Sequence, residues 1–351
     1  MPDDPRLFAR LRAHASLPLA ALAVGTFAFV ALDTARHTVI AAPADVARLL
    51  PQPDAASRMP LPLALPLTPP ADQAPPKATI ETFDPMAPPP PATPVTVENS
   101  EDLATLFENH DYTLDNVVTA GREVPAIAVT RMPGDLAKVP EVEKRKRLFI
   151  KALLPVVLQV NEEITADRQR LVWLRMQMES GEGLSATDAE WLEALAERYK
   201  TDAADYGELL RRVDVVPPAL AISQAVTESG WGTSWTARKG NALFGQYHIS
   251  SKSARTVAGA HVPGTFQVRA FDNVVQSVAA YASNLNTHHA YRKFRKQRAD
   301  MRDNNGVIDG YVLAGQLLAY SERGQDYVDF LRLIMRTENL RPLDEARLQR
   351  F

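Results

Sequence analysis

One glutamate in this chain of 351 residues stands in a setting that favours acid chemistry. A segment of small and apolar residues follows Val216-Pro217-Pro218 and runs to Glu228, and proline is well tolerated in the first turn of a helix. Glu228 would then lie in the last helical turn, where the negative end of the helix dipole tends to raise a carboxyl pKa. A raised pKa suits a general acid. On spacing alone, a capping or surface role is the commoner one for such a glutamate.

The neighbours of Glu228 fit a binding site. Gln224 lies four residues earlier, on the same helical face. Gly230 and Gly232 permit a sharp exit from the helix, and Trp231 offers a flat apolar ring of the kind that stacks on sugar faces. We therefore expect Gln224 and Trp231 to contact a substrate.

Several kinds of chemistry are excluded by composition. The chain has no cysteine, which rules out disulfides, thiolate zinc sites and cysteine nucleophiles. His288 and His289 are adjacent, so both cannot face one ion from a helix, and no H-E-x-x-H or G-x-S-x-G motif occurs. We expect no metal and no cofactor. A formal net charge of -3 gives no general attraction to nucleic acid.

The N-terminal segment resembles a membrane anchor. Arginines at positions 6, 10 and 12 precede the uncharged span 15–32, which has the length of a marginal transmembrane helix. Basic residues on the N-terminal side place residues 1–14 in the cytoplasm and the remainder outside. We expect a single-pass inner-membrane protein with its main domain in the periplasm. A cleaved signal peptide is the alternative.

Residues 43–98 are dense in proline and nearly devoid of aromatic residues. Such a segment cannot bury enough apolar surface to fold. It is expected to be a disordered, extended linker that reaches about 3.1 Å per residue.

Apolar residues in the rest of the chain recur mainly at helical spacing. The segments expected to be helical are 142–178, as two helices with a break near Pro155, and 188–209, 274–285, 308–320 and 326–336. Between Phe244 and Phe271 the pattern changes, and Thr256-Val257 with Phe266 to Ala270 suggest short strands around a Pro263-Gly264 turn. The expected fold is mainly α, of the α+β type, with a small β-hairpin lobe.

Residues 219–245, ALAISQAVTESGWGTSWTARKGNALFG, resemble the signature of the glucosaminidases of glycoside hydrolase family seventy-three. Four further segments are similar to the Bax family within that group: 149–164, 208–218, 284–298 and 318–331. This resemblance implies a lysozyme-like fold, with a helical N-terminal part at 100–210 and a glucosaminidase domain at 211–345. It also implies an endo-β-N-acetylglucosaminidase that cleaves β-1,4 bonds in the glycan strands of peptidoglycan, with Glu228 protonating the glycosidic oxygen.

Other site residues follow from the same resemblance. Tyr327 matches the cleft tyrosine of the family and is expected to be catalytic, whereas Tyr320 and Tyr291 match further aromatic positions. Asn241 and Phe244 belong to an element that reads N-x-x-F-G in this chain and leads into the β-lobe. Tyr320, Tyr291, Asn241 and Phe244 are expected to line the substrate cleft. Phe244 also suits a structural role.

The sequence departs from the family pattern at one point. Many relatives carry a second glutamate in the β-lobe, but this chain has no Asp or Glu between Glu228 and Asp272. A glycosidase still needs a group that stabilises an oxocarbenium-like transition state. The substrate acetamido group, held by Tyr327, is the favoured candidate. Glu322, which is also expected to contact the substrate, is the other. A lytic transglycosylase and a non-catalytic peptidoglycan-binding scaffold remain alternatives.

Overall fold

The computed structural model describes residues 90–119, 123–249 and 266–350. The predicted anchor at 15–32 and most of the predicted linker lie outside these ranges. Within them, no helix is both long enough and apolar enough to cross a bilayer. The described part overlaps the end of the predicted linker at residue 98, since the strand β1 occupies Thr93–Val95.

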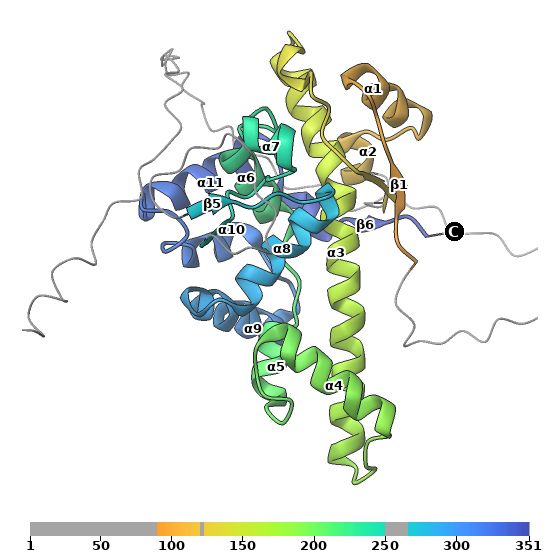
Figure 1. Cartoon of the computed structure of the whole chain (residues 1–351), viewed down its shortest axis with the longest axis vertical. Coiled ribbons are helices and arrows are strands. Elements are labelled where there is room, and N and C mark those ends of the chain that lie inside the picture. Colours follow the sequence, from red (N-terminus) through yellow and green to blue (C-terminus); the bar gives the residue numbers. More distant parts are fainter. Residues whose placement is uncertain (1–89, 120–122, 250–265, 351) are drawn as a thin grey trace, which may run out of the picture. The chain divides into compact units, whose positions relative to one another are not determined.

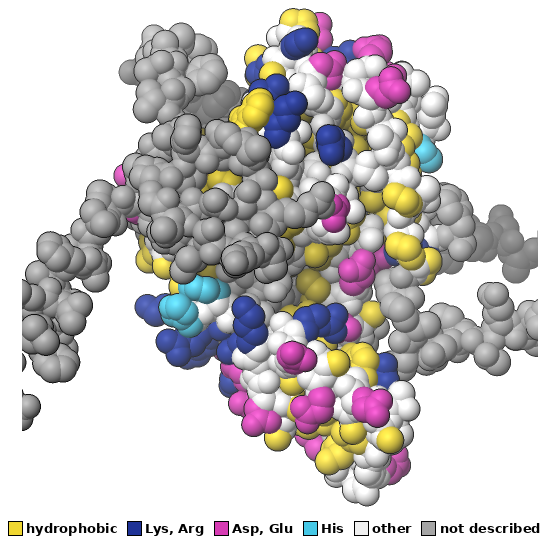
Figure 2. Space-filling model, in the orientation of Figure 1, with side chains coloured by type: hydrophobic (Ala, Val, Ile, Leu, Met, Phe, Trp, Pro, Cys, Tyr) yellow, Lys and Arg dark blue, Asp and Glu magenta, His cyan; other side chains and the backbone are white. Residues whose placement is uncertain are grey.

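Helices make up most of the described structure (Figure 1). The α-helices are α1 (Ser100–Asn109), α2 (Leu114–Thr119), α3 (Val142–Glu179), α4 (Ala186–Tyr199), α5 (Tyr206–Arg212), α6 (Pro218–Ser229), α7 (Trp235–Gly240), α8 (Val274–Thr287), α9 (Arg292–Asn305), α10 (Gly310–Leu313) and α11 (Gln325–Thr337). Short 3-10 helices are η1 (Leu136–Lys138), η2 (His289–Tyr291), η3 (Ala314–Gln316) and η4 (Arg341–Glu345). Charged side chains of both signs are spread over the visible surface (Figure 2).

The strands form three small sheets in the described residues. β1 pairs in parallel with β3 (Ile127–Val129), and β2 (Glu123–Val124) pairs in parallel with β6 (Arg347–Leu348). β4 (Tyr247–Ile249) pairs antiparallel with β5 (Phe266–Val268), so that Tyr247 lies opposite Val268. The predicted mainly α fold of lysozyme-like type with a small β unit is confirmed. The predicted strand at Thr256-Val257 and the predicted turn at Pro263-Gly264 lie outside the described residues.

One prediction about the segment that forms helix α3 is wrong. The sequence suggested two helices with a break near Pro155, but α3 continues through that proline for 38 residues. A proline inside a helix costs about 3 kcal/mol because it removes one backbone hydrogen bond and its ring crowds the preceding turn. Residues 152–154 and 156–158 on either side of Pro155 are all buried. Burial of these apolar side chains against the neighbouring elements outweighs the local cost.

Helix α6 is a central element of the core. All its residues from Pro218 to Val226 are buried, and it packs against α3, α10 and α11. Its N-terminus lacks a capping side chain of its own, since Pro217 holds that position. Asp344 supplies the cap from η4, because its carboxylate accepts hydrogen bonds from the backbone N–H of Ala219 (2.7 Å) and of Gly310 (2.9 Å). Long-range contacts therefore fix both the start and the direction of this helix.

Candidate active site

Glu228 occupies the last turn of α6, as predicted, and the chain then turns sharply away. Gly230 ends the helix in the left-handed conformation (φ 57°), and Trp231 also has a positive φ of 60°. A Cβ at Gly232 would lie 2.9 Å from the ring of Phe149, so this close approach to α3 requires glycine. The turn thus holds the end of α6 against α3 and fixes the backbone beside Glu228.

The Glu228 carboxyl contacts a tyrosine from the distant helix α11. The hydroxyl of Tyr327 donates a hydrogen bond to Oε1 of Glu228 at 3.0 Å. Tyr327 is 1% exposed, so its hydroxyl is shielded from competing water. The two predicted catalytic residues are therefore in direct contact.

A chain of hydrogen bonds supports this contact from behind. Gln224 donates from Nε2 to the hydroxyl oxygen of Tyr327 at 2.9 Å, and the hydroxyl of Tyr281 in α8 donates to Oε1 of Gln224 at 2.6 Å. Gln224 and Tyr281 are buried. Each donor in the series points toward Glu228, so Tyr327 is left with its own proton free to donate to the carboxyl.

Burial raises the pKa of Glu228 to about 7, against an ordinary value of 4.5. The hydrogen bond from Tyr327 and the positive charge of Arg323 oppose this rise. Burial and the nearby Glu228 charge hold the pKa of Tyr327 well above its usual value. Near neutral pH, a large fraction of Glu228 thus carries a proton that it can give up, and Tyr327 remains a donor.

The second carboxyl oxygen of Glu228 faces Gly245. A Cβ added at Gly245 would lie 3.0 Å from Oε2, and the φ of 60° at this residue favours glycine. Because Oε1 accepts from Tyr327, Oε2 is the oxygen available for the transferable proton. The missing side chain at Gly245 leaves space beside that oxygen.

Three further aromatic rings lie near the hydrogen bond between Tyr327 and Glu228. Tyr320 stacks on Tyr327 with ring centroids 5.6 Å apart, and its hydroxyl donates to the carbonyl of Phe244 at 3.1 Å. Tyr291 lies 5.9 Å from Tyr320. Phe244 stacks on Tyr281 at 4.0 Å and is buried, so it supports the tyrosines rather than offering a free face.

Three predicted substrate-binding residues are placed elsewhere or are engaged in other contacts. Trp231 packs edge-on against Phe149 of α3, with centroids 6.1 Å apart, and the Lys146 ammonium lies 5.5 Å from its centroid. Asn241 is 2% exposed and donates to the carbonyl of Phe271 at 3.0 Å, which is a structural contact. Glu322 is exposed. A substrate-binding role for these three therefore stays a prediction without support from their positions.

Sequence reasoning did not identify Tyr281, Arg323 or the contact made by Gly245. Tyr281 offered one usable signal, since a tyrosine on the buried face of a helix needs a partner for its hydroxyl. Gly245 ends the element that begins at Asn241, but its approach to Glu228, like that of Arg323, depends on how distant segments pack against α6.

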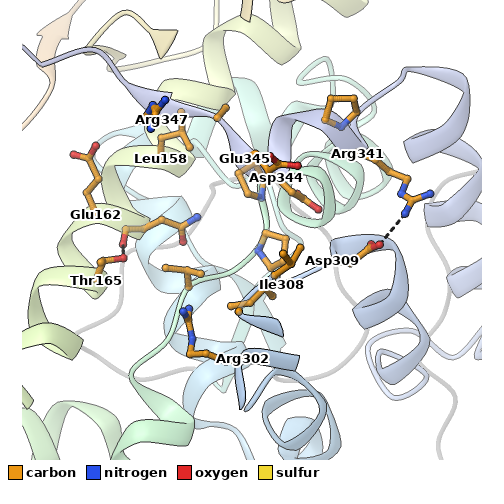
Figure 3. Close-up of a pocket in the computed structure, with 18 of the residues that line it drawn as sticks. Leu158, Glu162, Thr165, Arg302, Ile308, Asp309, Arg341, Asp344, Glu345 and Arg347 are labelled. Atoms are coloured by element: carbon orange, nitrogen blue, oxygen red, sulfur yellow. Dashed lines mark hydrogen bonds and ion pairs between the residues drawn. The ribbon is translucent and has the colours of Figure 1, made fainter. Parts of the chain in front are cut away.

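A cavity of about 850 Å³ lies at the other end of α6 (Figure 3). Pro217, Pro218 and Asp344 are among its lining residues, and Glu228 is not. Pro218 and Glu228 are ten residues apart in α6, so their backbones are about 15 Å apart at ~1.5 Å per residue. Two of its lining side chains, Arg341 and Asp309, form an ion pair at 2.8 Å, and a third, Asp344, caps α6. In the described ranges, no group of three or more His, Asp or Glu side chains could hold a metal ion.

Comparisons with known proteins match the part of the chain that contains this site. A family model described as mannosyl-glycoprotein endo-beta-N-acetylglucosaminidase, the glucosaminidase domain, matches residues 203–340, which contain Glu228, Gln224, Tyr281 and Tyr327. The class is therefore that of glucosaminidase-domain proteins. Protein bax of Escherichia coli (strain K12) is 36% identical over 203 residues, covering 56% of this chain and 71% of that protein. The chain belongs to the Bax family. No solved structure matches it significantly.

Proposed function

We propose that this protein is a peptidoglycan hydrolase, an endo-β-N-acetylglucosaminidase that cleaves β-1,4 glycosidic bonds with Glu228 as general acid. The observation that carries the proposal is the contact between Tyr327 and a partly buried carboxyl whose pKa is raised to about 7. Membership of a glucosaminidase-domain family supports a glycosidase. The bond cleaved and the role of Glu228 are the parts that need an experiment.

The proposed reaction begins with proton transfer from Oε2 of Glu228 to the glycosidic oxygen while the bond from that oxygen to the anomeric carbon breaks. The hydrogen bond from Tyr327 to Oε1 then stabilises the carboxylate that forms. Water can later attack the anomeric carbon, and the carboxylate takes a proton from that water. Glu228 thus returns to its protonated state.

The second catalytic group is proposed to come from the substrate. Because no Asp or Glu occurs between Glu228 and Asp272, the β4–β5 region has no carboxylate to offer. The acetamido oxygen of the sugar can bond to the anomeric carbon as the leaving oxygen departs, and water then opens the resulting ring. In the structure, the Tyr327 proton is directed to Glu228, which supports a role for Tyr327 in positioning the acid. The exposed position of Glu322 makes it the weaker candidate.

Product analysis tests the proposal. The full chain is incubated with purified peptidoglycan, and the new chain ends are identified by mass spectrometry. Reducing N-acetylglucosamine ends are expected, and Glu228→Gln should reduce their formation by about 10²- to 10⁴-fold. Anhydro-muramic ends would indicate a lytic transglycosylase. Binding without any cleavage would indicate a non-catalytic scaffold.

The cellular location is proposed from the sequence alone. We infer that residues 15–32 anchor the protein in the inner membrane, that residues 43–98 form the tether, and that the glucosaminidase domain lies in the periplasm. The uncharged span with basic residues before it supports this orientation. Cell fractionation should find the uncleaved chain in the inner membrane. A processed, soluble periplasmic form would contradict the anchor.

A further inference from the structure

The segment that follows the β5 strand carries an excess of positive charge. Between Asp272 and Asp300 the sequence has no Asp or Glu and five Lys or Arg residues. Two of these, Arg295 and Arg298, are buried. The others are exposed beside two exposed histidines, and together they form the η2–α9 basic surface: His288, His289, Arg292, Lys293 and Lys296. Figure 2 shows histidine side chains next to a group of Lys and Arg side chains on one side of the molecule.

This charge arrangement is unfavourable for the helix that carries it. Arg292 and Lys293 lie in the first turn of α9, which contains no acidic residue. The N-terminus of a helix is the positive end of its dipole, so a cation there destabilises the helix instead of stabilising it. Helix stability therefore does not explain these side chains, whereas a negatively charged partner would.

The same surface is continuous with the candidate active site. The His288 ring lies 5.7 Å from Tyr291, Tyr291 lies 5.9 Å from Tyr320, and Tyr320 stacks on Tyr327 at 5.6 Å. Tyr327 then reaches Glu228 through its hydrogen bond. This row of neighbouring rings, of which Tyr291 and Tyr327 are buried, places the basic surface close to the carboxyl, at a separation that one extended ligand can span.

The basic surface is held in place by a buried arginine. Arg295 donates from Nη1 to the carbonyls of Leu285 (3.0 Å) and His288 (2.9 Å), which ties α9 to the end of α8 and to η2. Partial burial lowers the pKa of His288, and the neighbouring His289 and Lys200 lower it further. His288 is therefore largely neutral near pH 7, and Arg292, Lys293 and Lys296 supply the positive charge.

We propose that the η2–α9 basic surface binds carboxylates of the peptide stems on a glycan strand whose scissile bond lies at Glu228. This inference rests on the proposed function and specifies the substrate as a strand that still carries its stems. Carboxylates on successive stems would meet Lys293 and Lys296 while the sugars occupy the site beside the tyrosines. An anionic membrane is the competing partner, and continuity with the catalytic carboxyl favours the strand.

The test compares two forms of one substrate. Stem-bearing strands are used as isolated or with their carboxylates converted to primary amides, which removes the charge and keeps the size. The variant Lys293→Gln/Lys296→Gln is compared with the control Lys144→Gln/Arg147→Gln. The control removes two exposed cations from α3 that are also three residues apart. Wild type should prefer the charged strands. The ratio of kcat/KM for charged over amidated strands should fall about three- to tenfold in the α9 variant, mainly through KM, and stay unchanged in the control.

Binding provides a readout that does not depend on cleavage. In the Glu228→Gln background, co-sedimentation with purified cell wall should weaken when Lys293 and Lys296 are replaced, and rising salt should weaken the binding of the parent. An inactive wild type that still shows this loss would contradict the proposed function and keep the binding surface. An unchanged ratio and unchanged co-sedimentation would overturn the inference. Reduced binding to vesicles of anionic lipid, with the ratio unchanged, would assign the surface to a membrane and also overturn it.

Discussion

Tyr327 donates a hydrogen bond to Glu228 across 3.0 Å, although the two residues are 99 positions apart in the chain. The contact forms because α11 packs against α6, with Tyr327 buried between them. It links the raised pKa of the carboxyl to a donor that stabilises the carboxylate after proton transfer. The following predictions depend on this pair and on the residues that hold it.

Glu228 should make folding stability depend on pH. Its folded-state pKa of about 7 exceeds the ordinary 4.5, so the folded state binds more protons between these values. Stability attributable to this group should therefore fall as pH rises from about 4.5 to 7 and stay constant above. Glu228→Gln removes the cost of ionising this buried carboxyl, so the free energy of unfolding of the variant should exceed that of wild type by more at pH 8 than at pH 5. The excess at pH 8 over that at pH 5 should be on the order of 1–3 kcal/mol. Denaturant titrations measure it, with the exposed Glu322→Gln as control. An equal difference at both pH values would contradict the raised pKa.

Tyr327→Phe should lower kcat by about 10²-fold, because the carboxylate formed in the reaction loses its donor. The same hydrogen bond lowers the Glu228 pKa, so its loss should move the alkaline limb of the kcat profile to higher pH. Glu322→Gln should cost less than about tenfold, under ~1.4 kcal/mol. Kinetics on soluble glycan fragments between pH 5 and 9 provide the comparison. The reverse ranking would assign the second catalytic role to Glu322.

Tyr281→Phe should act through Gln224. Without the Tyr281 proton, Oε1 of Gln224 becomes a buried acceptor with no donor, so the amide loses the contact that fixes its orientation and can rotate by half a turn. Oε1 would then accept the Tyr327 proton in place of Glu228. We expect kcat to fall about three- to tenfold with little change in KM, and the alkaline limb to move as in Tyr327→Phe. Tyr112→Phe is the matched control, because its buried hydroxyl has no hydrogen-bond partner among the described residues. Equal pH profiles for wild type and Tyr281→Phe would argue against this directed chain.

Gly245→Ala should block the approach to the proton-donating oxygen. The new Cβ would lie 3.0 Å from Oε2 of Glu228, and the left-handed backbone there costs a non-glycine residue about 1 kcal/mol. Gly306→Ala has a similar φ of 72° and no atom within 4 Å of the new Cβ, so it separates backbone strain from blocking. Both variants should lose similar stability in thermal unfolding. Only Gly245→Ala should lose at least about tenfold in kcat/KM. Equal activity in the two variants would show that the space beside Oε2 is not used.

The position of Glu228 was determined by local sequence. Two prolines start α6, small and apolar residues continue it, and Gly230 ends it in a left-handed conformation, so the sequence alone placed Glu228 in the last turn. The helical periodicity before and after this segment, and the change in pattern around β4 and β5, also depend on neighbouring residues. Such signals are readable because backbone propensity and burial of one face act over a few residues.

Other features were decided only by the tertiary structure. Pro155 remains inside α3 because burial on both sides of it outweighs the lost hydrogen bond, and Trp231 packs against Phe149 because the turn after α6 directs it to α3. The donation from Tyr281 to Gln224, and from Tyr327 to Glu228, joins helices far apart in the chain. Local residue patterns do not indicate which helices pack together or how a buried amide is oriented. Those choices depend on packing the whole core and on giving each buried polar atom a partner.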